Sequence, residues 1–168
     1  MTEKITEVDP DLVLLDELKD FTKHSLKIVE ETKSEILILS KALDPSIYNT
    51  EAFYQHILDM VRRDRDAHVK ILVKDIRSIV ARGHSLLDLA RRLPSKIEIR
   101  TLLARPVQDS AAYLIGDHKH LLFMHEDQIY NGAVNYDAEE ECKEMIDEFM
   151  VLWEKQSELD PAVHSLMI

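Results

Sequence analysis

Two short runs of apolar residues in the first half of the chain predict buried β-strands. Residues 35–40 are apolar at every central position, and residues 69–73 form a second run of the same kind. Strands that lack polar alternation are typical of a sheet that is covered on both faces. Residues 51–63, between the two runs, place Phe53 and Ile57 on one side of a helix. The strand, helix and strand together predict a right-handed parallel unit.

A long amphipathic helix is expected before the first of these strands. Asp9 and Pro10 suit an N-cap and a first helical position, and apolar residues then recur at helical spacing as far as Lys33. These apolar residues are Leu14, Leu15, Leu18, Phe21, Leu26 and Val29. The alternative is that residues 12–14 begin as a strand.

The segment after the second run predicts two short helices and a further strand. Asp75 is placed to cap a helical turn that ends at Gly83. Ser85 and Asp88 have the spacing of a capping box for the next helix. Residues 96–103 alternate between apolar and polar side chains, which indicates a half-buried strand.

Three short strands are predicted after residue 110. They cover residues 111–116, 119–124 and 128–134, with turns near Asp117 and Asp127, so this region is expected to form antiparallel hairpins. The predicted fold class is therefore α/β. Its mixed sheet has parallel N-terminal strands and antiparallel C-terminal strands, and helices flank it.

A C-terminal helix is predicted after residue 137. Asp137 and Glu140 have capping-box spacing. The apolar stripe that follows, including the core residue Cys142, consists of Cys142, Met145, Ile146, Phe149, Met150 and Trp153. We expect one domain over residues 11–157, with tails at 1–10 and 158–168.

Length and composition restrict the class of protein. A chain of 168 residues with 45% hydrophobic residues fits one domain with a substantial core. No apolar run approaches the roughly 20 residues that span a bilayer. The polar N-terminus lacks the apolar region of a secretory signal, and the single cysteine suits a reducing compartment. We therefore expect a cytoplasmic protein.

Charge is distributed unevenly along the chain, whose net charge is −11. Residues 1–60 carry 6 basic and 13 acidic side chains, residues 61–105 carry 12 and 5, and residues 106–168 carry 3 and 14. A positive middle of this kind predicts an anion site or a partner surface. Solvated acidic helices at the two ends explain the same counts, so both interpretations stay open.

The carboxyl ends of the two parallel strands predict one anion site, because ligands of open α/β sheets bind beyond these ends. Lys41 follows the first strand, and Lys74, Asp75 and Arg77 follow the second. A guanidinium matches phosphate oxygens in a bidentate way, so a phosphate group suits this set. The alternative is that Asp75 only caps a helix and the cations form a solvated rim.

A second candidate ligand site lies just after the predicted end of a helix at Gly83. Glycine can adopt the left-handed backbone that ends a helix, which would aim His84 toward residues 75–77. Arg92 can pair with an acid one helical turn earlier, whereas Arg91 lacks such a partner. His84, Arg91 and Arg92 are therefore candidate ligand contacts.

Three histidines, His118, His120 and His125, lie in the predicted hairpins. On a strand, His118 and His120 share one face while His125 points to the other, so they do not suggest a metal triad. With 3 glycines in the chain, no phosphate-binding glycine loop is recognisable. We expect no metal and no cofactor.

The segment from His118 to Asn135 resembles one half of a phospholipase D-like domain. That superfamily carries a histidine, a lysine two residues later, an acid five residues after the lysine, and a G-S-x-N sequence downstream. His118 matches the histidine, and residues 132–135 lie at the distance of the G-S-x-N element. The positions of the lysine, the acid and the serine are occupied by His120, His125 and Ala133.

This resemblance implies a fold whose chemistry is degraded. In that superfamily the histidine attacks phosphorus and the lysine holds the phosphate charge. Loss of the lysine and the acid removes most of the electrostatic stabilisation on which phosphoryl transfer depends. We therefore assign no catalytic residue, and His118 is the candidate if catalysis occurs. A chain with one motif must dimerise to bring two motifs together, so a homodimer is also implied.

A closer resemblance covers about residues 16–154. The stretches 40–45, 69–75 and 83–100 are similar to an uncharacterised proteobacterial phospholipase D-like family, whose members occur alone or behind a GNAT acetyltransferase domain. The resemblance implies distinctive positions in the positive middle of the chain, which are Asp75, Arg77, His84, Arg91, Arg92 and Arg100.

Three hypotheses of function follow. The leading one is a non-catalytic module that binds a phosphate-bearing ligand or nucleic acid through the basic middle of the chain. An alternative is a dimeric phosphodiesterase-like hydrolase that uses His118. The third is a protein-interaction domain that partners an acetyltransferase. No contact with a membrane is expected.

Overall fold

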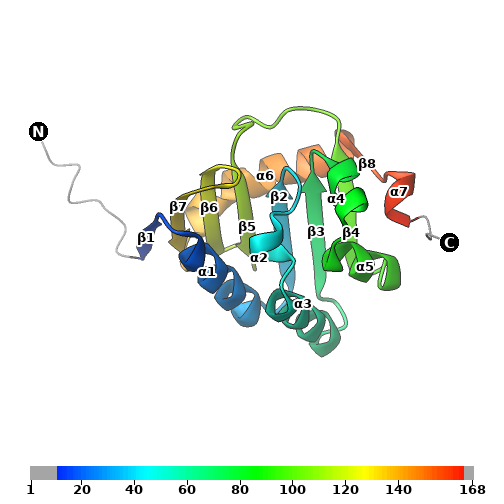
Figure 1. The fold of residues 1–168 in the computed structure, drawn as a ribbon. Coiled ribbons are helices and arrows are strands. Elements are labelled where there is room, and N and C mark those ends of the chain that lie inside the picture. Colours follow the sequence, from blue (N-terminus) through cyan, green and yellow to red (C-terminus); the bar gives the residue numbers. More distant parts are fainter. Residues whose placement is uncertain (1–10, 165–168) are drawn as a thin grey trace, which may run out of the picture.

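A computed structural model describes residues 11–164, which form one mixed sheet with helices on both faces (Figure 1). The strands are β1 (Leu12–Leu15), β2 (Glu35–Ser40), β3 (His68–Val73), β4 (Ile97–Leu102), β5 (Ala112–Gly116), β6 (His120–Glu126), β7 (Ile129–Asn135) and β8 (Ser157–Glu158). The helices are α1 (Leu18–Glu31), α2 (Pro45–Tyr48), α3 (Glu51–Arg63), α4 (Ile76–Arg82), α5 (Ser85–Arg92), α6 (Glu139–Lys155) and α7 (Pro161–His164). Among these described helices, none has the length and apolar character needed to cross a membrane.

The sheet has a parallel centre and antiparallel flanks. Its strand order is β1-β7-β6-β5-β2-β3-β4-β8. Strands β2, β3 and β4 run parallel, with Ile71 of β3 opposite Ile38 on one side and Ile99 on the other. Strands β5, β6 and β7 form antiparallel hairpins, and β5 joins them to β2. The predicted mixed α/β fold is therefore confirmed.

Successive residues of β2 face two different hydrophobic cores, which explains why this strand lacks polar alternation. Ile36 and Ile38 belong to the core beneath α1, α3 and α5. Leu37 and Leu39 belong to the core beneath α6, which crosses the opposite face of the sheet (Figure 1). Helices cover both faces of the sheet, so each strand residue needs an apolar side chain.

The two predicted hairpin turns are present. Asp117 and His118 both have positive φ values, 49° and 63°, and the N–H of Lys119 donates to the carbonyl of Gly116 at 3.1 Å. These values are typical of the two-residue turn whose twist matches that of antiparallel strands. The second turn contains Asp127 and Gln128, and the β6–β7 register shifts beside it.

The beginning of α1 differs from the predicted helix. Residues 12–15 pair with β7 as an edge strand, and the helix begins at Leu18. The alternative that residues 12–14 form a strand is therefore the correct one. The apolar residues at 12–15 fit both a short strand and the spacing of a helix. The sequence pattern therefore could not distinguish a strand from a helix here. Asp9 and Pro10, the predicted helix start, lie outside the described residues.

Two predicted capping boxes are also absent. Helix α5 is capped by the side chain of His84, which accepts the N–H of Leu86, and not by Ser85. The N-cap of α6 is Ala138, and no side chain caps this end, so Asp137 and Glu140 do not form the expected box.

The chain continues to pack on the domain after residue 157. Strand β8 pairs with β4, and Val163 of α7 is fully buried. Part of the segment 158–168, which was expected to be a tail, therefore contributes to the hydrophobic core.

Candidate phosphate site at the edges of the sheet

Lys41, Lys74 and Asp75 lie together at the carboxyl ends of β2 and β3. The carbonyl of Lys41 accepts the N–H groups of Lys74 at 3.0 Å and Asp75 at 2.8 Å. Asp75 caps α4 and accepts two hydrogen bonds from Ser78, which lower the pKa of its carboxyl. Arg77 is exposed and forms no ion pair with any described residue.

Carboxylates balance the cations at this carboxyl edge. Lys74 binds Asp109, with 3.1 Å between the ammonium and a carboxylate oxygen. Asp127 accepts the N–H of Lys41 at 2.6 Å, and burial raises the pKa of Asp127. Asp44 is buried and accepts a 2.7 Å hydrogen bond from the Tyr130 hydroxyl. A phosphate at this edge would meet several acids as well as Lys41, Lys74 and Arg77.

His84 is buried in the fold, and its two ring nitrogens are bonded to residues other than 75–77. Its Nε2 donates to the carbonyl of Leu43 at 3.1 Å, while its Nδ1 accepts the N–H of Leu86. Burial lowers the pKa of His84 to about 4, so the imidazole is neutral near pH 7. Gly83 does adopt a positive φ of 83°, as expected for the end of a helix.

Arg91 and Arg92 have partners that differ from the expected ones. Arg91 donates to the main-chain carbonyls of Val163 at 2.6 Å and Ala162 at 2.9 Å, and it also lies 4.0 Å from Asp88. Arg92 instead donates to the Tyr54 hydroxyl at 3.0 Å. The expected pairing of Arg92 with the acid of its own helix is therefore wrong, and Arg91 is the residue near that acid.

Arg100 is bound within the fold as well. Its Nε donates to Glu98 at 2.5 Å, and its guanidinium lies over the ring of Trp153 at 4.9 Å. The predicted ligand residues thus occupy several separate places. His84, Arg91 and Arg100 have internal structural partners, whereas Lys41, Lys74, Asp75 and Arg77 share the carboxyl edge.

His118 lies at the opposite, amino edge of the parallel strands. Its Nε2 donates to one oxygen of Glu35 at 2.5 Å, and Nε2 of His68 donates to the other oxygen at 2.6 Å. Lys70 lies 3.4 Å from the same carboxylate. Burial acts to raise the pKa of Glu35, but the hydrogen bonds from His118 and His68 outweigh it and the pKa is lowered.

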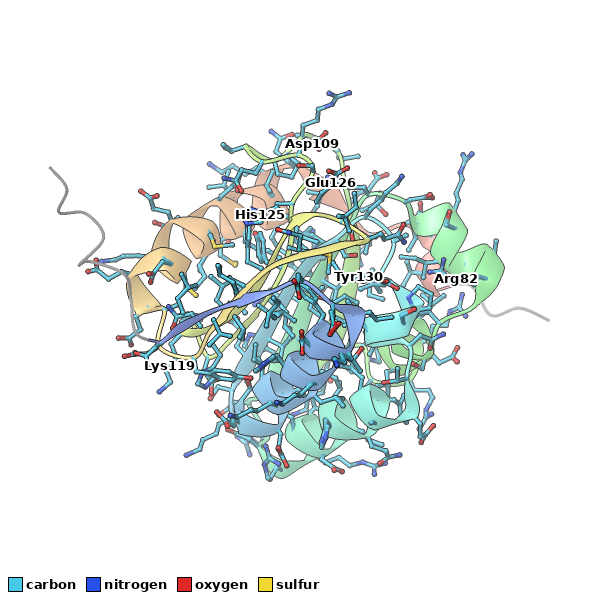
Figure 2. All side chains as sticks on the ribbon, turned by 60° about the vertical axis from the view of Figure 1, so that its left-hand side comes forward. Arg82, Asp109, Lys119, His125, Glu126 and Tyr130 are labelled. Atoms are coloured by element: carbon cyan, nitrogen blue, oxygen red, sulfur yellow. The ribbon has the colours of Figure 1, made fainter. Side chains whose placement is uncertain are left out.

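The remaining positions of the phospholipase D-like motif do not supply a cation beside His118. His120 is buried and its Nδ1 lies 3.0 Å from the carbonyl of Tyr136. His125 is at the far end of β6 from Lys119 (Figure 2). Because His118 belongs to the turn, it does not share a strand face with His120, and that expectation is wrong.

A groove at the amino edge gathers basic side chains that the sequence analysis did not single out. This amino-edge groove has a volume of about 370 Å³. Its charged and titratable lining residues are Arg65, Asp66, His68, Lys70, Lys96 and Glu98. Glu98 is bound by Arg100 and Lys70 is bound by Glu35, so Arg65 and Lys96 are the groove cations that have no ion pair among the described residues.

Main-chain carbonyls hold two of the cations near this groove. The ammonium of Lys96 donates to the carbonyls of Asp64, at 3.2 Å, and Arg65. Arg63 donates to the carbonyl of Thr32 at 3.3 Å. A carbonyl orients a cation without cancelling its net charge, so these side chains are fixed and still attract anions. In the sequence, this groove is indicated by the excess of basic over acidic side chains in residues 61–105.

The chain belongs to a family described as a domain of unknown function, DUF7931, whose model matches residues 17–166. No match was found among curated proteins. Solved structures share its fold. TrmBL2, described as an archaeal chromatin protein, superposes with a TM-score of 0.65 and 22% identity over 92% of this chain and 56% of its own. The present chain therefore spans little more than half of that protein.

Two further solved structures are similar at lower identity. NucT from Helicobacter pylori has a TM-score of 0.59 and 11% identity over 86% of this chain and 95% of its own. Phosphatidylserine synthase from Haemophilus influenzae has a TM-score of 0.54 and 10% identity over 85% and 37%. These neighbours establish a phospholipase D-like fold, as the sequence resemblance implied.

Proposed function

We propose that this protein is a non-catalytic phospholipase D-like module that binds nucleic acid through the phosphates of its backbone. The observation that carries the proposal is the amino-edge groove, which is lined by Arg65 and Lys96, together with Lys70 and His68, which bind Glu35. Arg65 is exposed and has no ion pair among the described residues, and Lys96 is held only by carbonyls. Cations oriented in this way are typical of sites that contact phosphate groups.

The amino edge supports this proposal better than the carboxyl edge does. At the carboxyl edge, Asp109 pairs with Lys74 and Asp127 lies beside Lys41, which leaves Arg77. At the amino edge, Glu35 pairs with Lys70, which leaves both Arg65 and Lys96. At the same edge, α3 ends with Arg62 and Arg63, which precede the groove residue Arg65 in the chain. A phosphodiester backbone needs a row of such cations, because each one neutralises a phosphate and releases counterions.

The surroundings of His118 favour binding over hydrolysis. His118 lines a hollow together with Glu139, Glu140, Asp147 and the cation Lys143, and the excess of acids disfavours a phosphate there. Lys70 lies on the other oxygen of Glu35 from His118, so its charge is already paired with a carboxylate. A hydrolase would need a cation placed on the phosphate that His118 attacks.

The description of one solved neighbour motivates nucleic acid as the ligand. TrmBL2 is described as a chromatin protein with a novel mode of DNA binding. Its identity to this chain is low, so the likeness establishes the fold and only motivates the choice of ligand.

Fluorescence anisotropy with labelled single-stranded and double-stranded oligonucleotides tests the proposal. The full chain is compared with a double variant, Arg65→Gln with Lys96→Gln, at low and raised salt. We expect the wild type to bind at low salt and the variant to bind about tenfold more weakly, since two phosphate contacts are lost. Thermal melting of each protein establishes that it is folded.

A matched control removes two exposed charges that follow the carboxyl ends of β3 and β4, Arg77→Gln with Arg105→Gln. This control has the same net charge as the first double variant, and we expect it to bind nearly as the wild type does. Equal loss in both variants would indicate binding by net charge alone and would contradict the proposed groove. Greater loss in the control would place the ligand at the carboxyl edge with Lys41 and Lys74.

The same proteins are incubated with bis-p-nitrophenyl phosphate to test for hydrolysis. We expect none. Turnover that disappears in His118→Ala would overturn the non-catalytic proposal and support a hydrolase, and gel filtration would then establish whether the active species is a dimer.

A further inference from the structure

A separate pocket of about 310 Å³ lies between α6 and the sheet, on the opposite side of the molecule from α1 and α3. The side chains of Leu39, Phe123 and Met145 give it an apolar lining. The loop that contains Val107 forms part of its wall. This pocket is at the lower end of the range for small-molecule sites, which is roughly 300–1,000 Å³. None of the residues in the amino-edge groove contributes to it.

Tyr113, which lines this pocket, carries a buried polar group that is unpaired among the described residues. Its side chain lines the pocket, is 4% exposed, and its hydroxyl has no hydrogen-bond partner among the described residues. Burial raises the pKa of Tyr113, so the phenol keeps its proton at any ordinary pH. A buried hydroxyl normally has a partner, and this one can both donate and accept.

Two carboxylates line the same pocket. Glu144 and Glu148 project from one face of α6, four residues apart, and both line the pocket. One oxygen of Glu148 accepts the N–H of Val107 at 2.6 Å, which ties the loop to the helix. Neither carboxylate has an ion pair with a described residue. An apolar cavity with a negative mouth favours a ligand that has a cationic group.

We infer that this pocket binds a small aromatic amine. The flat ring lies among Leu39, Phe123 and Met145, and a polar atom of the ring pairs with the Tyr113 hydroxyl. The ammonium group faces Glu144 and Glu148 at the mouth. The inference is independent of nucleic-acid binding, because it concerns a different face of the sheet and a ligand of opposite charge.

Tryptamine is a suitable probe, since it combines an indole N–H with an ammonium group. Two analogues each change one feature. Indole-3-propionate keeps the indole but carries a carboxylate, and 2-(1-naphthyl)ethylamine keeps the ammonium but lacks the ring N–H. Binding is measured by chemical-shift changes of the ¹⁵N-labelled full chain and by calorimetry.

We expect tryptamine to bind with a dissociation constant roughly in the millimolar range, as is usual for a ligand of this size. Indole-3-propionate should bind at least about tenfold more weakly, because Glu144 and Glu148 repel it. The naphthyl analogue should bind about threefold to tenfold more weakly than tryptamine, because it leaves Tyr113 unpaired. Shifts should centre on residues that line the pocket.

Two conservative variants complete the test. Tyr113→Phe removes only the hydroxyl and should abolish the preference for tryptamine over its naphthyl analogue. Glu148→Gln keeps an acceptor for the N–H of Val107 and should weaken both amines. Tyr54→Phe removes a hydroxyl outside the pocket and should change nothing.

The inference is overturned if tryptamine causes no saturable shifts at the pocket, or if tryptamine and indole-3-propionate bind the wild type equally. It is also overturned if Tyr113→Phe retains the preference for tryptamine. The comparison of ligands on the wild-type chain needs no variant, so the test stands even if a variant fails to fold.

Discussion

The guanidinium of Arg91 donates at 2.6 Å to the main-chain carbonyl of Val163, a residue 72 positions later in the chain. A second bond to Ala162 makes Arg91 the connection between α5 and the C-terminal segment. We expect Arg91→Ala to reduce the free energy of unfolding by about 1–3 kcal/mol, because hydrogen bonds to a partly buried charged group are lost. Urea denaturation measures this change.

Arg92→Ala is the matched control, since Arg92 is exposed and its hydrogen bond within residues 11–164 is to the Tyr54 hydroxyl. The control should change stability by no more than about 0.5 kcal/mol, as for most surface substitutions. Equal effects of the two substitutions would contradict a structural role for Arg91.

Because burial lowers the pKa of His84, we expect the free energy of unfolding to decrease at mildly acidic pH. Its pKa is lowered by burial from 6.5 to about 4. The unfolded chain therefore takes up a proton below pH 6.5 that the folded chain takes up only near pH 4. Stability from this group is complete above pH 6.5 and decreases as the pH falls to 4, by about 3 kcal/mol in total.

His84→Asn tests this pH dependence, because asparagine also caps a helix but does not titrate. Urea denaturation at several pH values should show a smaller decrease between pH 6.5 and 4 for the variant than for the wild type. Parallel curves for the two proteins would show that another group is responsible.

Gly132 lies where the chain has no room for a side chain. A Cβ at this position would lie 1.8 Å from the carbonyl oxygen of Phe123 on the neighbouring strand. We expect Gly132→Ala to lower the free energy of unfolding by at least about 2 kcal/mol, since strand β6 or β7 must shift. Ala133→Ser, at the next and partly exposed position, should be tolerated within about 0.5 kcal/mol.

Nucleic-acid binding through the amino-edge groove also predicts a specific salt dependence. The slope of the logarithm of the binding constant against the logarithm of salt concentration should decrease by about 1 for each phosphate-contacting cation that is removed. Lys96→Gln should therefore reduce the slope once, and Arg65→Gln with Lys96→Gln twice. Arg77→Gln should leave the slope unchanged. An unchanged slope in the double variant would exclude phosphate contacts at this groove.

The order of the elements and the mixed sheet could be predicted because they depend on local patterns. Residues 35–40 and 69–73 are apolar because both faces of the sheet are covered, and positive φ values in the Asp117 turn suit the hairpin expected there. The start of α1 could not be predicted. Strand β1 exists because it pairs with β7, whose residues lie more than a hundred positions away in the chain.

The arrangement of the cations could not be predicted either, because their partners also lie far away in the chain. Arg91 binds carbonyls of the C-terminal segment, and Arg100 lies over Trp153 of α6, so neither partner is a neighbour in sequence. Ligands of open α/β sheets bind at the carboxyl ends of strands, so the sequence predicted the anion site at Lys41 and Lys74. The basic groove with Lys96 instead lies at the amino ends, where the loops after α3 and α5 meet.

His118 lies in the turn between β5 and β6, where the backbone conformation does not require a histidine. Glycine adopts a φ near 63° more readily than histidine does, so the loop itself has no requirement for an imidazole. Glu35 would also keep His68 and Lys70 as partners without it. The backbone of the corner thus accepts other side chains, and an exchange there would act through Glu35, whose pKa the hydrogen bond from His118 helps to lower.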